Sequence, residues 1–233
     1  MLRLTTLLLL VLFTCPTLYA QDTLRVMVYN LLFYGQNNTF CNRDCKDTQL
    51  REILANERLD IFAANEISNG GNQANVNSNA LLANVLNQGG TTRWQRAPIV
   101  TGTTHPILNA LYFNSDKLGH LRFETADRSF PRLDLHKLYY KSADLATGGD
   151  TIFLHIGVFH QKAGDTQSDR QQRGRDIESY IQLMDRWGGI DNLMLMGDYN
   201  CTSSDDPGYA PLLVWNNPDG QLRDPINRPG NCN

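Results

Sequence analysis

The chain has 233 residues, which is enough for one large domain or two small ones. Its 24 acidic residues slightly outnumber its 21 Lys and Arg residues, and the sequence holds no basic run and no strongly cationic half. This balance argues against a protein that coats nucleic acid through many phosphate contacts, although a bound metal ion could still supply positive charge to one phosphate.

The first 20 residues follow the three-part pattern of a secretory signal peptide. Arg3 gives a short positive start, an unbroken apolar run covers Leu7 to Phe13, and Ala20 offers a small residue for cleavage. That run is too short to span a membrane, and no other segment approaches the necessary length. The sequence therefore predicts cleavage after Ala20 and a secreted or periplasmic protein. A buried first strand or helix, and a lipid anchor at Cys15, are the weaker alternatives.

The rest of the chain reads as strands and helices in mixed order. Apolar runs or alternation predict strands over residues 23–32, 60–67, 109–113, 133–140, 151–159 and 192–198, and helical spacing predicts helices over 47–59, 78–88 and 165–187, with a shorter one over 207–215. Consecutive strand candidates between residues 94 and 138 argue against a pure βαβ alternation. The predicted fold class is α/β in the broad sense (α+β), a two-layer β-sandwich flanked by helices, formed by one domain over residues 21–233.

Four cysteines follow the predicted signal peptide: Cys41, Cys45, Cys201 and Cys232. An exported protein meets an oxidising compartment, and four cysteines allow three pairings. The close pair Cys41 and Cys45 could staple a loop, while Cys201 with Cys232 could tie down the C-terminal region. A zinc site is the rival interpretation, disfavoured because no histidine sits at metal-ligand spacing beside either pair.

Polar residues stand where several predicted strands end. Asn30, Glu66 and His160 each follow or close an apolar strand, and Asp198 and Asn200 follow another, on the same side of the chain. An acid in such a place is costly to bury unless it is paired or bound to a metal, and several strand ends can converge into one polar pocket. Taken singly, each residue has an ordinary explanation as a turn former, a surface acid or an edge histidine. Their order and settings together carry the functional hypothesis.

The segments around these residues are Val28-Tyr29-Asn30, Asn65-Glu66, Phe159-His160-Gln161-Lys162-Ala163-Gly164 and Met196-Gly197-Asp198-Tyr199-Asn200. In this order they resemble the motifs of the endonuclease/exonuclease/phosphatase family, the deoxyribonuclease-like proteins, in its secreted bacterial form. Members include pancreatic deoxyribonuclease, abasic-site endonucleases, bacterial sphingomyelinases and inositol phosphatases. The last segment is similar to the family's Gly-Asp-Phe-Asn motif. The second is similar to its Gln-Glu metal-binding motif, with Asn65 in place of Gln.

The resemblance implies a role for each residue. Glu66 would be the main Mg²⁺ ligand with Asn30 beside it, and Mn²⁺ or Ca²⁺ are alternative metals. His160 would contact the scissile phosphate and help the leaving oxygen, while Asp198 would orient or deprotonate the attacking water. Asn200 would donate hydrogen bonds to phosphate oxygens.

Three arginines begin the long predicted helix just after the histidine segment. For two of the three, the ordinary interpretation is a solvated helix face paired with Asp169 and Asp176. Arg173 is the one predicted to make a structural or substrate-binding contact, whereas Arg170 and Arg175 are assigned to the solvated face.

One family motif is missing. The family normally ends with a strand carrying Ser-Asp-His, and this sequence contains no Ser-Asp-His. The resemblance therefore implies that the 233 residues are a fragment of a longer reading frame and that this chain is itself inactive or nearly so. A naturally shortened inactive protein is the less favoured alternative.

The sequence thus predicts a secreted, metal-dependent phosphoester hydrolase, a monomeric phosphodiesterase or endonuclease with nucleic acid as the first-choice substrate. A lipid or sugar-phosphate phosphoesterase of the same fold is the alternative within this class. A non-catalytic binding module, in which Glu66, His160 and Asp198 would be relics, is the alternative from another class. The loop over residues 68–79 directly follows Glu66 and could line the cleft.

Overall fold

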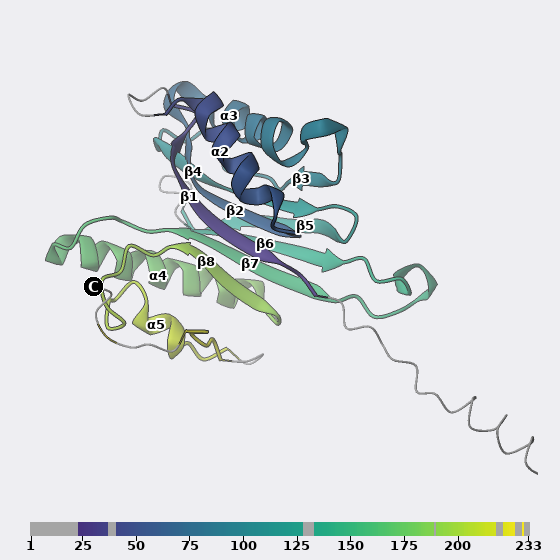
Figure 1. The fold of residues 1–233 in the computed structure, drawn as a ribbon. Helices are drawn as coiled ribbons and strands as arrows, with labels where there is room; N and C mark the ends of the chain where they lie inside the picture. Colours follow the sequence, from purple (N-terminus) through teal and green to yellow (C-terminus); the bar gives the residue numbers. More distant parts are fainter. Residues whose placement is uncertain are drawn as a thin grey trace, which may run out of the picture.

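The computed structural model describes residues 23–36, 41–127, 133–188, 190–217, 221–226 and 230. Two four-stranded sheets lie face to face, and helices cover the outer face of each (Figure 1). This arrangement confirms the predicted two-layer sandwich flanked by helices. The predicted signal peptide over residues 1–20 lies outside the described residues. None of the described helices is both long and apolar enough to cross a membrane.

The first sheet has the strand order β1-β2-β4-β3. Its strands are β1 (Val26–Tyr34), β2 (Ile61–Ser68), β4 (Ile107–Asn114) and β3 (Trp94–Arg96). β1 and β2 are parallel, and the other two pairs are antiparallel. β2 is buried along nearly its whole length, which explains why its sequence is a continuous apolar run rather than an alternating one.

The second sheet has the strand order β5-β6-β7-β8. Its strands are β5 (Leu118–Thr125), β6 (Leu133–Tyr140), β7 (Phe153–His160) and β8 (Leu193–Asp198). β7 and β8 are parallel, and the other pairs are antiparallel. Each sheet therefore contains one parallel pair, and each of these pairs includes an edge strand of the described part of the chain.

Two helices cover the first sheet, α2 (Arg43–Ala55) and α3 (Ala74–Leu81), and α3 continues into a π-helical segment over Leu82–Leu86. Two cover the second sheet, α4 (Gln167–Trp187) and α5 (Ala210–Leu213). Short 3₁₀ turns lie at Gly70–Asn72, Gln88–Gly90 and Leu145–Thr147.

The start of α2 differs from the prediction, which placed it at Asp47. Asn42 caps the helix because its side chain accepts a hydrogen bond from the Cys45 backbone N–H at 3.0 Å. A disulfide joins Cys41 to Cys45 across this first turn, so the close pairing is confirmed and zinc binding by this pair is excluded. Cys201 forms no disulfide with any described residue, and its candidate partner Cys232 lies outside the described residues.

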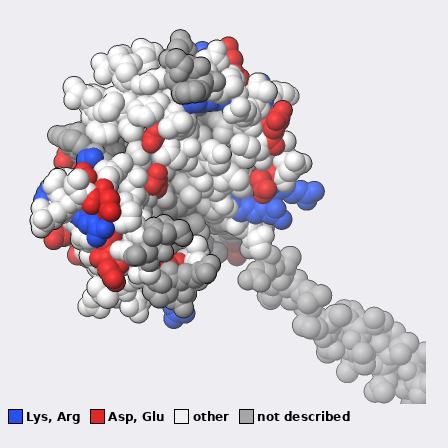
Figure 2. Space-filling model, turned by 60° about the vertical axis from the view of Figure 1, so that its left-hand side comes forward, with Lys and Arg blue, Asp and Glu red and all other residues white. Residues whose placement is uncertain are grey.

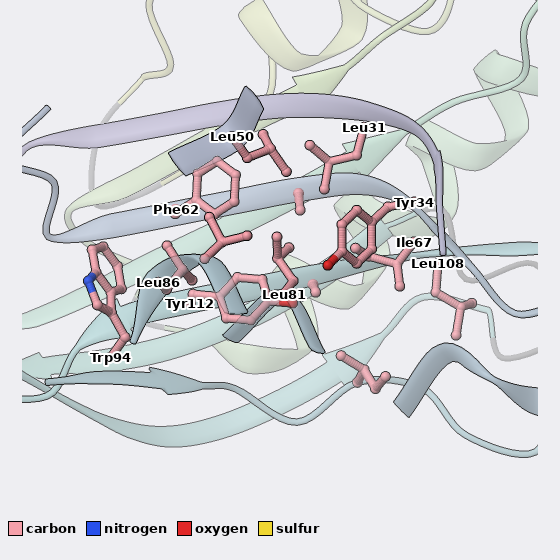
Figure 3. Packing of buried hydrophobic residues seen from close by; sticks show 14 of the residues in the cluster. Leu31, Tyr34, Leu50, Phe62, Ile67, Leu81, Leu86, Trp94, Leu108 and Tyr112 are labelled. Atoms are coloured by element: carbon pink, nitrogen blue, oxygen red, sulfur yellow. The ribbon is translucent and has the colours of Figure 1, made fainter. Parts of the chain in front are cut away.

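Three hydrophobic clusters hold the layers together. The central one joins the two sheets and contains Ile61, Ala63, Ala97, Leu111, Phe113, Leu118, Leu138, Ile156, Val158 and Met196. A second packs α2 and α3 against the first sheet (Figure 3). In it, the Tyr34 hydroxyl donates a 2.5 Å hydrogen bond to the Asp47 carboxylate, which ties α2 to β1. The third packs α4 and α5 against the second sheet.

β1 and β8 are edge strands of the described part, and they lie on the same side of the sandwich. An apolar groove of about 860 Å³ runs between them, lined also by α5 and residues 221–226. Val28 on β1 and Met194 on β8 are among its more exposed side chains. The groove adjoins the strand ends that carry the predicted functional residues.

β6 carries a buried acid, Asp134. Its side chain makes hydrogen bonds with Thr125 and Asn109, and the phenol of Tyr180 lies near it. Its Oδ1 atom is buried and finds no hydrogen-bond partner among the described residues. Burial raises the pKa of Asp134 to about 7, and the two hydrogen bonds only partly oppose this shift.

The contribution of Asp134 to stability depends on pH in a definite direction. Because its folded-state pKa of about 7 lies above the ordinary value of about 3.9, the contribution is fully present below pH ~4 and is lost as the pH rises through 7. We expect the free energy of unfolding of the wild type, relative to Asp134→Asn, to fall between pH 4 and 7 in urea titrations. The exposed Asp150→Asn variant is the control. If the difference in the free energy of unfolding between the wild type and Asp134→Asn does not change with pH, the raised pKa of Asp134 is contradicted.

Candidate functional site

Four predicted residues meet at one end of the sandwich because both parallel strand pairs end there. On the first sheet Asn30 of β1 lies opposite Asn65 of β2, and on the second His160 of β7 lies opposite Asp198 of β8. Glu66 follows Asn65 directly. Parallel strands bring their carboxyl ends to the same edge, which is where open α/β sheets place ligand sites.

One amide group joins the two carboxylates of the site. Asn30 Nδ2 donates to Glu66 Oε1 at 2.9 Å and to Asp198 Oδ2 at 3.0 Å, so it connects the two sheets. His160 Nε2 lies 3.4 Å from the same Glu66 Oε1 atom. The structure therefore brings Asn30, Glu66, His160 and Asp198 together, as the strand ends suggested.

A bulge in β1 orients the Glu66 carboxylate. Three residues of β1, 31–33, lie opposite Glu66 alone on β2, and the Phe33 backbone N–H donates to Glu66 Oε2 at 3.2 Å. Leu32, Phe33 and Glu66 have φ values of +47°, +59° and +60°. This left-handed backbone is costly for residues with a side chain and is typically retained where the geometry serves a site.

Helix α2 braces this bulge through Lys46, which sequence reasoning did not identify. Lys46 Nζ donates to the carbonyl of Leu31 at 3.1 Å and to that of Leu32. Burial lowers the pKa of Lys46, while the charge of Glu66 opposes the shift. The only sequence signal was a lysine within the first turns of a helix next to a disulfide, which is not specific.

The end of β8 is shaped by Gly197 and Asn200. Gly197 has φ +142°, and a Cβ atom there would lie 2.0 Å from the Phe159 carbonyl oxygen, so glycine lets β8 approach β7 closely. Asn200 has φ +50°; its backbone N–H donates to Asp198 Oδ1 at 3.0 Å, and its side-chain amide donates to the Gln161 carbonyl at 3.0 Å. One N–H of that amide remains for another acceptor.

A small open pocket of about 380 Å³ lies over these groups. It is lined by Val28, Tyr29, Asn30, Asn65, Gly197, Asp198, Tyr199, Asn200 and Cys201. Val28 and Tyr199 also line the apolar groove between β1 and β8, so the two spaces adjoin.

Solved structures share this architecture. The human Nocturnin catalytic domain with bound sulfate aligns over 81% of this chain and 68% of that one, at 17% identity and TM-score 0.56. D. rerio TDP2 complexed with single-strand DNA product aligns over 82% and 68%, at 12% identity and TM-score 0.53. Sphingomyelinase C from Streptomyces griseocarneus aligns over 83% and 70%, at 17% identity and TM-score 0.53. These proteins belong to the endonuclease/exonuclease/phosphatase superfamily.

The chain has the deoxyribonuclease-like fold. No protein-family model matches the sequence, and no curated protein matches it either. The similarity to these solved structures is therefore a similarity of fold.

The carboxylate oxygens at these strand ends are suitable ligands for a hard divalent cation such as Mg²⁺. Glu66 and Asp198 present carboxylate oxygens, a ligand type that Mg²⁺ prefers, whereas the Asn30 amide turns its NH₂ group toward them and its oxygen accepts the Leu32 backbone N–H at 2.9 Å. Across the described ranges, no three His, Cys, Asp or Glu side chains come close enough to form a metal cage. Mg²⁺ sites commonly use one or two carboxylates and leave the other positions to water and phosphate. Two carboxylates without a cluster of three ligand side chains are therefore compatible with Mg²⁺.

The structure places Arg173 inside the protein. Its side chain is fully buried, and its Nε and Nη2 atoms donate to the Asp206 carboxylate at 3.0 and 2.5 Å. Nη1 donates to the carbonyls of Lys162 and Gly164. Arg173 thus holds together the loops that follow β7 and β8. Of the two predicted roles of Arg173, a structural contact or a substrate contact, this geometry matches the structural one. Arg173 could affect a substrate only by positioning these loops.

Other cations near the site are paired with acids. Lys162 lies 3.1 Å from Asp169, and Arg170 lies 2.7 Å from Asp165. On the face shown in Figure 2, Lys and Arg side chains form small separate groups next to Asp and Glu, with wide uncharged areas between them. This surface offers no continuous basic track in that view.

The Arg173–Asp206 pair is expected to dominate the stability of the two loops. Burial raises the pKa of Asp206, but hydrogen bonds from Arg173 and Gly208 outweigh it, and the pKa lies below its ordinary value. Asp206→Ala leaves a buried positive charge, so we expect a loss of about 3–5 kcal/mol in the free energy of unfolding. Denaturant titrations would measure it, with exposed Asp205→Ala as the control. Equal stability of the two variants would show that the pair is dispensable.

Proposed function

We propose that this protein is a secreted, metal-dependent phosphoester hydrolase that cleaves phosphodiesters, with nucleic acid as its substrate. The observation that carries the proposal is the pair of carboxylates, Glu66 and Asp198, joined through Asn30 and placed beside His160. The deoxyribonuclease-like fold supports the reaction class, because its solved examples include a DNA-product complex and a sphingomyelinase.

Each side chain has a chemical task in this proposal. A bound Mg²⁺, held by Glu66 and Asp198 with Asn30 beside them, would neutralise charge that develops on the phosphoryl oxygens. The Asp198 carboxylate orients the attacking water and accepts its proton, while His160 holds a proton near the leaving oxygen. The spare N–H of the Asn200 amide donates to a phosphate oxygen.

Nucleic acid is supported by the open pocket over the strand ends, whose lining includes Asn30, Asp198 and Asn200, and by the single-strand DNA product bound to a protein of the same fold. A lipid phosphodiester is the second candidate, and a specific observation favours it. Tyr29, Leu32 and Phe33 stand exposed around the site, and Leu32 is 62% exposed. Sphingomyelinase C has the same fold, so an apolar group beside the phosphate is compatible with this scaffold.

Secretion is supported by the disulfide between Cys41 and Cys45, since disulfides persist in oxidising compartments. The signal-peptide pattern of residues 1–20 supports the same location. The protein is proposed to act outside the cytoplasm as a monomer.

The function is tested by Glu66→Gln, with exposed Glu52→Gln on α2 as the matched control. We expect Glu66→Gln to weaken Mn²⁺ binding in calorimetry and to lower EDTA-sensitive cleavage of plasmid DNA at least ~100-fold, because even groups that merely orient metal ligands are worth about 10–100-fold. The control should match the wild type. Unchanged Mn²⁺ affinity in Glu66→Gln would favour the non-catalytic binding module.

We also expect the 233-residue chain to turn over slowly. All five histidines are described, and only His160 lies at the site, so a carboxylate is left to activate the water. Carboxylates are weak bases at neutral pH, and a well-matched general base contributes about 10²–10⁴-fold. Hydrolysis of bis-p-nitrophenyl phosphate with Mg²⁺ should therefore be far below the ~1–10³ s⁻¹ of typical enzymes. EDTA-sensitive turnover within that range would overturn this expectation.

A further inference from the structure

Asn65 joins the two sheets at the catalytic edge. Its side chain is fully buried, and its Nδ2 atom donates to the Asn109 side-chain oxygen at 2.8 Å and to the Phe159 carbonyl at 2.7 Å. Its Oδ1 atom accepts the backbone N–H of Asp198 at 3.2 Å. Both amide hydrogens and the carbonyl oxygen of this side chain are therefore engaged.

The hydrogen bonds of Asn65 involve backbone positions at or directly beside the three groups proposed to react, Glu66, His160 and Asp198. Glu66 follows Asn65 in β2, His160 follows Phe159 in β7, and the bonded N–H on β8 belongs to Asp198 itself. A single side chain from the first sheet thus sets the positions of two strands of the second sheet. Asn30 links the carboxylates at their tips, whereas Asn65 links the backbones that carry them.

Two further buried polar residues hold the Asn65 amide in its orientation. Asn109 on β4 accepts from Asn65 through Oδ1 and donates through Nδ2 to the Val158 carbonyl at 3.4 Å. Asp134 on β6 makes a hydrogen bond with Asn109 from the other side. Buried polar groups are costly unless they are satisfied, and the Asn65 amide is satisfied at both hydrogens and at its oxygen, although Asp134 Oδ1 at the far end of the chain has no partner among the described residues.

We infer that Asn65 is a positioning residue that fixes the separation of the two sheets at the catalytic edge, and that Asn109 and Asp134 fix the orientation of its amide. The positioning of backbone groups stands on the geometry alone, whereas its effect on turnover rests on the proposed hydrolase function. The lengths of the bonds make the fit specific. A Gln at position 65 carries the same amide one methylene further, where both acceptors are already at 2.7–2.8 Å.

Amide hydrogen exchange tests the inference without any activity. We expect Asn65→Leu to lower the protection of the Asp198 amide at least tenfold, while amides in the middle of β6 and β7 keep theirs. Asn65→Asp keeps an acceptor for that N–H but loses both donors, so Asp198 should stay protected more than in Asn65→Leu. Unchanged protection at Asp198 in Asn65→Leu would overturn the inference.

A matched control comes from Asn114, a buried asparagine at the opposite end of the first sheet. Its amide donates to Asp60 Oδ1 at 3.3 Å, and its oxygen accepts the Asp116 N–H at 3.1 Å. Asn114→Leu should lower the melting temperature but leave exchange at Asp198 unchanged. A similar exchange loss in both variants would mean that Asn65 acts only through global stability.

Turnover supplies the second readout. In EDTA-sensitive hydrolysis of bis-p-nitrophenyl phosphate, Asn65→Leu should lower kcat at least tenfold and leave KM within about threefold, at temperatures where it is fully folded. The exchanged pair Asn109→Asp with Asp134→Asn lets the new Asn donate to the new Asp, which still accepts from Asn65. It should retain more activity than Asn109→Leu.

The two hypotheses fail in different ways. If the wild type binds no Mn²⁺ and cleaves nothing, the proposed function fails, and exchange at Asp198 still decides the role of Asn65. If the wild type hydrolyses the ester and Asn65→Leu shows an unchanged kcat and unchanged exchange, the positioning role fails and the function stands.

Discussion

The site depends on the contact of one neutral amide with two carboxylates. Glu66 and Asp198 come from different sheets, and Asn30 Nδ2 lies within 3.0 Å of an oxygen of each. Two like charges held this close repel each other by a few kcal/mol, about 4 kcal/mol for unit charges 4 Å apart at an effective dielectric constant of 20. The amide offsets part of this repulsion, and a divalent cation would offset the rest. The packing of the two sheets is what forces the acids together.

Several residues at the strand ends that form the site have a strained backbone. Leu32, Phe33, Glu66 and Asn200 all have left-handed φ values, and each contributes a backbone or side-chain group to the site. Such conformations cost of order 1–3 kcal/mol each and persist only where the surroundings determine them. Here the surroundings are the lysine brace on the β1 bulge and the close approach of β8 to β7 at Gly197. The conformational cost is thus concentrated at the residues that orient the carboxylates.

The sequence predicted the strands better than the helix starts. β6 has the bounds that its apolar pattern indicated, and α4 ends where predicted. The start of α2 was missed because its cap, Asn42, precedes the apolar spacing by a full turn. Helix α3 was predicted to begin at Ser78 but begins at Ala74, whose N–H is accepted by the Asn69 side chain. A side-chain cap sets the boundary of α2, whereas the cap residue of α3, Gln73, makes no capping hydrogen bond with its side chain and the acceptor comes from Asn69, five residues before Ala74. Hydrophobic periodicity sets neither boundary.

Sequence reasoning also found the strand-end residues but not what holds them. Asn30, Glu66, His160 and Asp198 could be grouped because each closes an apolar strand. The Asn65–Asn109 bond joins residues of two strands far apart in sequence. Asn65 stood out only as the residue in place of Gln in the Asn-Glu segment, and Asn109 has no local signature. Arg173 did have one. It shares a helical face with Ile177, Tyr180 and Met184, all buried, which is the spacing of an inward-facing side chain.

The charge around the site bears on how a substrate would be held. Lys162, Arg170 and Arg173 are each engaged with an acid, and Lys46 is engaged with backbone carbonyls. A protein that binds phosphates through lysine and arginine releases counterions, so its affinity falls steeply with salt. Here the positive charge nearest the phosphate would come from the metal, and the rim of the site is apolar. Binding would then depend on metal concentration more than on ionic strength. A substrate would be selected by the group beside the phosphate rather than by the number of phosphates along a strand.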